Sequence, residues 1–166
     1  MQMGDWRFFW PESVSAYAGL PQAWDSALNT GIGKSAISTL WINSYLNFTS
    51  LFSKVGLSWN LINLIFWFIP PIILSFFSAY LLFNYLFKNN YKFLAGFIYL
   101  FNTYFLIILS GGQLGVAFSY SLAPLVILSF LKLFQAPSLK KSLTTGILLA
   151  IQIIFDPRIV YITLIS

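Results

Sequence analysis

The sequence contains no cysteine, no histidine and very little charge. The missing cysteine excludes disulfide bridges and thiol nucleophiles, and the missing histidine excludes a Ser-His-Asp triad. Together the two absences exclude zinc sites built from histidine and cysteine ligands. Only 8% of the residues are charged, against roughly 25% in an average soluble domain. So little charge cannot cover a water-facing surface, and we expect lipid to surround most of the chain.

The few charges also exclude nucleic acid as a partner. The formal net charge is +5, but the basic residues are scattered and form no patch of the kind that duplex binding requires. No cofactor site is identifiable, no metal ligands are assigned, and a need for a divalent metal stays open. The expected partner is membrane lipid.

Apolar residues make up 58% of the chain and aromatic residues 20%. Long apolar runs separated by short polar links predict an all-α, polytopic transmembrane helix bundle. The final run, Ile159–Ser166, covers about 12 Å of helix, against roughly 30 Å of hydrocarbon. We therefore expect a fragment of a longer protein, with a short complete protein as the alternative. The prediction is about four full spans and a truncated fifth, at 59–87, 93–109, 114–134, 138–155 and 157–166.

Residues 1–56 form a separate region of mixed composition before the transmembrane region 57–166. Its helical period over about 35–55 predicts an amphipathic helix lying in the membrane interface, with a surface helix on a soluble core as the alternative. Gly31–Ser35 reads GIGKS, but the glycine that a phosphate-binding loop needs is absent at Leu28. We expect a turn there, with Ser35 as the helix N-cap. The expected apolar face carries Ile37, Trp41, Tyr45, Phe48, Phe52 and Val55, and the opposite face carries Thr39, Asn43, Asn47, Ser50 and Lys54.

The distribution of charge predicts the orientation. The links near 88–92 and 132–141 hold five lysines and no acid, whereas all four acids lie in the other segments. Under the positive-inside rule the lysine links are cytoplasmic and residues 1–56 are extracytoplasmic. The expected location is a bacterial plasma membrane, crossed several times.

The stretch GDWRFFWPES at residues 4–13 contains the most suggestive acid. Asp5 is followed by several aromatic residues, and an apolar wall raises the pKa of a carboxylate enough for it to act as a general base. Arg7 opposes that shift or holds a phosphate. The alternative for Asp5 is an interfacial anchor without catalytic function.

Two further polar breaks share the predicted outer face. Asp156, Pro157 and Arg158 have the pattern of a helix N-cap followed by a first-turn proline. They also place an acid and a base at the membrane boundary, where an anionic headgroup or a sugar would lie. The Ser110–Gln113 link allows close backbone approach through its glycines, and Gln113 offers both a donor and an acceptor. A plain turn also explains this link.

The order of these motifs resembles a known family. The chain has GDWRFFWPES, a W-x(6)-G segment at Trp24–Gly31, FNTYF at Phe101–Phe105, SGGQLGVAFSYSLAPL at Ser110–Leu125 and FDPR at Phe155–Arg158. This order is similar to the N-terminal part of bacterial membrane proteins with the GT-C glycosyltransferase architecture, including those similar to mycobacterial arabinofuranosyltransferases and YfhO-type membrane proteins. The usual form of FNTYF has proline where this chain has Thr103.

The resemblance implies transfer of a sugar from a polyprenyl-phosphate donor to an extracytoplasmic glycan or lipid acceptor. It also implies a transmembrane helix before a long outer loop whose early carboxylate is the general base, a position that Asp5 matches. In this hypothesis Arg158, with Arg7, neutralises the donor phosphate, and Gln113 and Asp156 position the sugar. The alternatives are a transporter or flippase of a lipid-linked precursor and a non-catalytic membrane protein.

Overall fold

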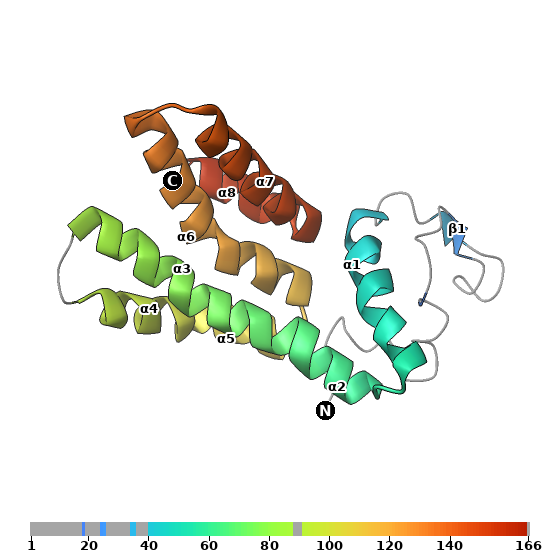
Figure 1. Cartoon of the computed structure of the whole chain (residues 1–166). Coiled ribbons are helices and arrows are strands. Elements are labelled where there is room, and N and C mark those ends of the chain that lie inside the picture. Colours follow the sequence, from blue (N-terminus) through green and yellow to red (C-terminus); the bar gives the residue numbers. More distant parts are fainter. Residues whose placement is uncertain (1–17, 19–23, 26–33, 36–39, 88–90, 166) are drawn as a thin grey trace. The chain divides into compact units, whose positions relative to one another are not determined.

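A computed structural model describes residues 18, 24–25, 34–35, 40–87 and 91–165. These residues are helical apart from short turns and one antiparallel pair of two-residue strands, β1 (Trp24–Asp25) and β2 (Lys34–Ser35). The chain divides into two compact units between Phe66 and Trp67. The division lies inside a long helix, and each unit is described by itself (Figure 1).

The helix of the N-terminal unit begins later than the sequence predicts. Ser35 pairs with Trp24 in the strand pair, so it does not cap a helix. The helix α1 covers Leu40–Ser50 and continues as a 3₁₀ segment, Leu51–Val55. Gly56 ends this segment in the left-handed conformation, with φ of 88°, which glycine adopts at no steric cost.

The two predicted faces of the helical segment 40–55 differ in exposure. Phe48 and Val55, on the expected apolar face, are 52% and 81% exposed. On the expected polar face, Asn47 and Ser50 are buried. The hydroxyl of Thr49, which is also buried, donates to the Leu46 carbonyl at 3.0 Å, a local bond that allows this polar side chain to be buried.

The first predicted span is one continuous helical run of 29 residues. It comprises α2 (Trp59–Ile62), a π-helical segment (Asn63–Phe68) and α3 (Ile69–Phe87). In an α-helix the Phe66 carbonyl would accept the N–H of residue 70, and in a π-helix that of residue 71. Both residues are proline, which has no backbone N–H. The hydroxyl of Tyr45 donates to this carbonyl at 2.7 Å. Burial raises the pKa of Tyr45 to about 12, so the hydroxyl keeps its proton at neutral pH.

The second predicted span, 93–109, is broken. Its helices α4 (Lys92–Leu100) and α5 (Thr103–Ser110) meet at an angle of 43°. Asn102 causes the break because its side chain accepts the Phe105 amide at 2.8 Å, which caps the new helix. Thr103 is therefore the first residue of α5, the position that favours proline and that the usual form of the motif fills with proline.

The third predicted span is the helix α6 (Leu114–Gln135), with Pro124 inside it. Pro124 cannot donate to the carbonyl of Tyr120, four residues earlier. The hydroxyl of Tyr99, on α4, donates to this carbonyl at 2.8 Å, and the rings of Tyr99 and Tyr120 are stacked with centroids 4.5 Å apart. In both helices, proline leaves one carbonyl without its usual N–H donor. The hydroxyl of a tyrosine from a neighbouring element donates to that carbonyl instead: Tyr45 to Phe66 and Tyr99 to Tyr120.

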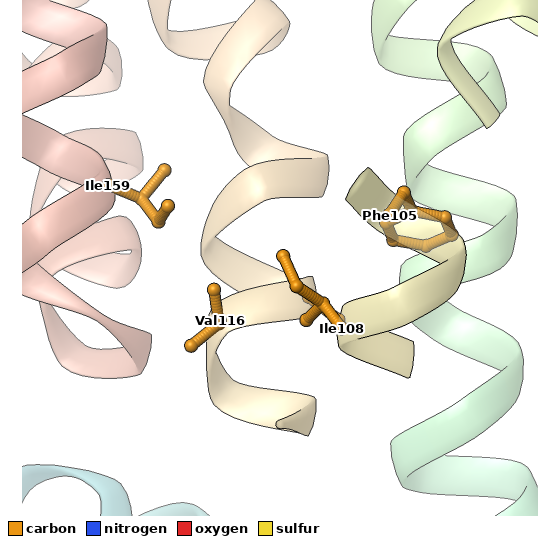
Figure 2. Packing of buried hydrophobic residues seen from close by; sticks show 5 residues of the cluster. Phe105, Ile108, Val116 and Ile159 are labelled. Carbon is orange, nitrogen blue, oxygen red and sulfur yellow. The ribbon is translucent and has the colours of Figure 1, made fainter. Parts of the chain in front are cut away.

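The helix α6 is the centre of the C-terminal unit. It lies between α3 on one side and α7 (Leu139–Phe155) and α8 (Pro157–Ile165) on the other (Figure 1). Small residues, including Ser75, Ser78 and Ser121, are buried along the helices, as is typical of helices that pack closely in membranes. Phe105, Ile108, Val116, Ala117 and Ile159 form a buried hydrophobic cluster that joins α5, α6 and α8 (Figure 2).

Glycine permits the contact between α3 and α4. A Cβ atom at Gly96 would lie 2.8 Å from ring carbons of Phe76. Because real Cβ atoms do not approach so closely, the absence of a side chain at Gly96 lets the Phe76 ring pack directly on the backbone of α4.

Two described helices are long and apolar enough to cross a membrane, Trp59–Phe87 and Leu114–Gln135. A third span results if the bent pair α4 and α5 crosses as one unit. The helix α7 has 17 residues, or about 26 Å at 1.5 Å per residue. The described residues are therefore almost entirely helical, and the length and composition of their helices indicate membrane association.

The bond from Tyr99 to the Tyr120 carbonyl is testable by a double-mutant cycle. Tyr99→Phe should lower the free energy of unfolding by about 1 kcal/mol, since it leaves a buried carbonyl without a donor. In a Pro124→Ala background the restored amide bonds the carbonyl, so the same substitution should have little effect. Reversible unfolding in mixed micelles measures both values. Tyr161→Phe, on an exposed part of α8, is the control, and an equal cost of Tyr99→Phe in both backgrounds would contradict the assignment.

Candidate functional site

The turn between α7 and α8 is built by the Asp-Pro-Arg sequence. Asp156 ends α7 in an extended conformation, with φ of −161° and ψ of 111°. Its Oδ1 accepts the amide of Arg158 at 2.8 Å, as an N-cap side chain does, and Pro157 is the first residue of α8. The predicted capping arrangement is confirmed.

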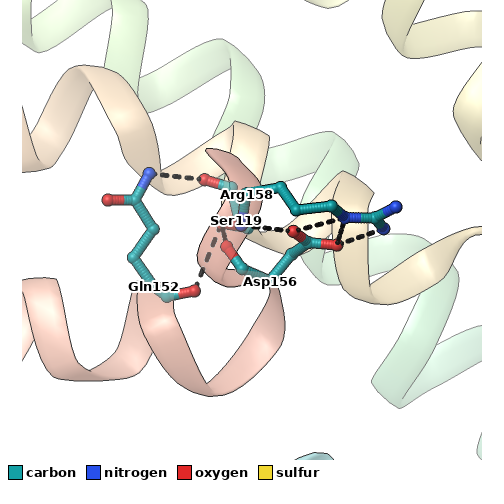
Figure 3. Close-up of polar contacts among 4 residues, drawn as sticks. All are labelled: Ser119, Gln152, Asp156 and Arg158. Atoms are coloured by element: carbon teal, nitrogen blue, oxygen red, sulfur yellow. Dashed lines mark hydrogen bonds and ion pairs between the residues drawn. The ribbon is translucent and has the colours of Figure 1, made fainter. Parts of the chain in front are cut away.

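The same carboxylate binds the side chain of Arg158 (Figure 3). The Nη2 atom of Arg158 lies 2.6 Å from Oδ2 of Asp156, and its Nε lies 3.1 Å from both carboxylate oxygens. The side chain of Asp156 is 7% exposed, whereas that of Arg158 is 76% exposed. A buried acid therefore fixes the direction of a largely exposed guanidinium.

The surroundings of Asp156 favour its charged form. Burial by itself would raise the pKa of this carboxyl group, but the side chain and amide of Arg158, its positive charge and the amide of Ile159 outweigh burial. The pKa of Asp156 therefore lies below its ordinary value, and the group is a carboxylate at neutral pH. A proton-accepting role at neutral pH would need the opposite shift, so Asp156 is suited to positioning Arg158.

A buried polar network holds this turn against α6 (Figure 3). The hydroxyl of Ser119 lies 3.0 Å from the Asp156 carbonyl and 3.2 Å from the Gln152 carbonyl. In return, Nε2 of Gln152 donates to the Ser119 carbonyl at 3.1 Å and to Oγ1 of Thr163 at 2.8 Å. Ser119 and Gln152 are fully buried, so α6, α7 and α8 are joined by polar contacts in an otherwise apolar interior.

Sequence reasoning missed this network, although one signal was present. Gln152 is a polar residue inside an apolar run and lies four residues before Asp156, on the same helix face. Polar residues at such positions usually face the protein interior or a functional site. The partners Ser119 and Thr163 are separated from Gln152 along the chain and had no such signal.

The other predicted site residues have different outcomes. Asp5 and Arg7 lie outside the described residues. Gln113 is exposed at the N-terminus of α6. Its backbone amide donates to the Ile108 carbonyl at 3.1 Å, and its backbone carbonyl accepts the Ala117 amide at 3.0 Å. Ser119 follows six residues later, which corresponds to a rise of about 9 Å along the helix. The structure brings Asp156 and Arg158 together and places Gln113 at the start of the helix that contacts them.

The chemistry available at the turn is anion binding. A guanidinium held by a carboxylate and exposed on its far side presents planar N–H donors suited to phosphate or carboxylate oxygens. Among the described residues no group of three or more acidic, histidine or cysteine side chains could hold a metal ion. The described part of the site therefore offers one oriented cation.

The two functions of Asp156 can be separated by substitution. Asp156→Asn keeps an N-cap acceptor but removes the charge, and Asp156→Ala removes both. We expect the free energy of unfolding to fall by about 0.5 kcal/mol for Asn and about 1–2 kcal/mol for Ala, because the exposed guanidinium makes the ion pair itself weak.

The charge contribution should depend on pH. Since the pKa of Asp156 is lowered by folding, the advantage of wild type over Asp156→Asn should be complete above about pH 5 and disappear as the pH falls through the native pKa. Unfolding curves from pH 7 to pH 3 measure it. An advantage that grows toward low pH would contradict the assigned ion pair.

Comparison with known proteins does not assign the chain to a family. No protein family model, curated protein or solved structure matches the chain. Function is therefore inferred from the chemistry of the Asp156–Arg158 turn and from the membrane setting of the helices.

Proposed function

We propose that the chain is part of a GT-C-type polytopic glycosyltransferase of a bacterial plasma membrane. It transfers a sugar from a polyprenyl-phosphate donor to an extracytoplasmic acceptor in cell-envelope glycan or glycolipid synthesis. The observation that carries the proposal is the guanidinium of Arg158, which is 76% exposed and is oriented by a buried carboxylate at a helix start. A cation held in this way suits a lipid-linked phosphate at the membrane boundary.

The proposed topology has four spans, followed by α8. The four are Trp59–Phe87, the bent pair α4 and α5, α6, and α7 with the first residues of its preceding link. The lysine links near 88–92 and 132–141 then lie in the cytoplasm. Residues 1–56, the Ser110–Gln113 link and the Asp156 turn lie on the outer face. The exposed Phe48 and Val55 support an interfacial position for the helical segment of residues 40–55.

In the proposed reaction Asp5 accepts the proton of an acceptor hydroxyl. The hydroxyl oxygen then forms a bond to the anomeric carbon of the donor sugar, and the bond between that carbon and the phosphate oxygen breaks. The leaving polyprenyl phosphate carries the electron pair, and Arg158, with Arg7, stabilises its negative charge. Gln113 binds sugar hydroxyls. Asp156 acts by holding Arg158, because its carboxylate oxygens are already occupied by that side chain and by backbone amides.

A transporter or flippase of the same lipid-linked precursor is the second candidate. The observation that favours it is the break at Asn102, because transporters bind substrate at discontinuous transmembrane helices. In that function the charges on the outer face bind the substrate, and no covalent bond changes. A third candidate, a non-catalytic membrane protein, is favoured by the local satisfaction of Asp156 as an N-cap.

An assay with membrane-embedded protein and radiolabelled polyprenyl-phosphate sugars separates the candidates. We expect Asp5→Asn to lower the transfer rate by at least about 10²-fold, the typical contribution of a general base. Arg158→Ala should lower the rate by a similar factor, and Arg158→Lys should restore only part of it because it loses the planar pair of donors. Lys140→Gln, in the lysine link, is the control and should transfer sugar at the wild-type rate.

The possible results exclude one another. Transfer by Asp5→Asn at the wild-type rate would show that the assigned base is wrong. Movement of the intact lipid-linked sugar across a vesicle membrane without transfer would favour the flippase. Absence of both activities, with binding of the donor unaffected by Arg158→Ala, would favour the non-catalytic protein.

A further inference from the structure

A cavity of about 670 Å³ lies among α3, α4, α6 and α8 of the C-terminal unit. This volume is within the usual range of ligand sites, about 300–1,000 Å³. Most of its wall is aliphatic or aromatic, with Leu82, Ile98 and Ile127 contributed by three different helices. Among the described residues that line it, none carries a charge. The cavity therefore suits a hydrocarbon group.

The cavity extends over about half the thickness of a membrane. Its wall on α4 runs from Tyr91, at the link near 88–92, to Asn102 at the helix break. These eleven steps correspond to about 16 Å of helix, against roughly 30 Å for the hydrocarbon core. That depth matches one lipid leaflet. It is too short for a crossing helix of another protein.

The end of the cavity near the helix break is lined by three residues that form hydrogen bonds with one another. The Tyr99 hydroxyl donates to the Tyr120 carbonyl at 2.8 Å, and the Asn102 amide donates to the Tyr99 carbonyl at 2.6 Å and also to the Tyr120 hydroxyl. Because these polar groups form hydrogen bonds with one another, this end of the cavity presents mainly the apolar surface of the tyrosine rings to an occupant. The apolar end of a hydrocarbon chain fits there.

The side of the cavity is open to the surroundings of the helices. Leu94, Ile98 and Ile162 line it and are 55%, 63% and 60% exposed. In a membrane these side chains face lipid chains. A lipid of the bilayer can therefore enter from the side, without passing through the protein.

Two lysines lie at the same end of the helices as the lining residue Tyr91. Lys92 follows the lining residue Tyr91, and Lys132 lies five residues beyond the lining residue Ile127. Their ammonium groups lie 5.5 Å and 5.7 Å from the ring centroids of Tyr80 and Tyr85, near the end of α3. Among the described residues of the C-terminal unit the acid is Asp156, which lies toward the other end of α6. The charges described at this end of the helices are therefore positive.

We propose that this cavity holds an acyl chain of an anionic glycerophospholipid whose phosphate lies at Lys92 and Lys132. The site is separate from the Asp156–Arg158 turn, because the lysines and the turn are at opposite ends of the helices. It does not depend on the proposed transfer reaction, and it would belong equally to a transporter. The apolar wall selects the chain, and the two lysines select the charge of the headgroup.

Native mass spectrometry of the full chain tests this site. The protein is reconstituted with equimolar phosphatidylglycerol and phosphatidylcholine of identical acyl chains, and the lipids retained on release from the micelle are counted. We expect phosphatidylglycerol to be favoured by roughly fivefold per lysine. Lys92→Gln with Lys132→Gln should bring the ratio close to one, and Lys54→Gln, on the N-terminal unit, should leave it unchanged.

Filling the cavity tests its hydrocarbon part. Ala95→Phe and Ala123→Phe place a ring in the cavity from α4 and from α6, and each should lower retention of both lipids. Ala150→Phe, on the exposed side of α7, is the matched control. In the wild-type protein, a phosphatidylglycerol with a diazirine in its acyl chain should label peptides that contain Leu94, Ile98 or Ile127.

Four results would overturn the proposal. They are equal retention of the two lipids by wild type, unchanged retention by both filled variants, diazirine labelling confined to other helices, or a second protein chain bound at the cavity in place of lipid. The labelling experiment uses only the wild-type chain, so it decides the question even when both filled variants fail to fold.

Discussion

The architecture of this chain depends on backbone carbonyls that proline leaves without a donor. Pro124 removes the amide that would bond Tyr120, and Pro70 and Pro71 remove those that would bond Phe66. In hydrocarbon no water replaces a missing donor, so a carbonyl without a partner destabilises the fold. The hydroxyls of Tyr99 and Tyr45 supply the bonds at 2.8 and 2.7 Å. Each bond also fixes the position of one helix against another.

The bond at Tyr120 organises most of the C-terminal unit. It holds α4 against α6 at the level where Asn102 ends one helix and begins another, and the residues that form it line one end of the cavity. One residue away, Ser119 holds the Asp156 turn through the carbonyl of Asp156 and the Gln152 network. The two faces of α6 thus position a proposed lipid site and a proposed anion-binding site.

Features that depend on local sequence were predictable, and those that depend on distant contacts were not. Apolar runs predicted the spans 59–87 and 114–134, close to the helices observed, and the Asp156-Pro157 pair identified the start of α8. The break at Asn102 was missed because apolar runs precede and follow it along the chain. Tyr99 and Tyr120 are 21 residues apart, so no local sequence pattern predicted their hydrogen bond. Ser35 was misassigned because its strand partner, Trp24, lies across a loop.

The central claim is that α6 crosses the membrane, with the Asp156 turn at one face and the lysine link at the other. Because the chain has no cysteine, single cysteines at Ser110 and Ser138 can be labelled with a membrane-impermeant maleimide in intact cells. The account predicts labelling of Ser110→Cys in intact cells and of Ser138→Cys only after the membrane is opened. Labelling of both positions from the same side would contradict it.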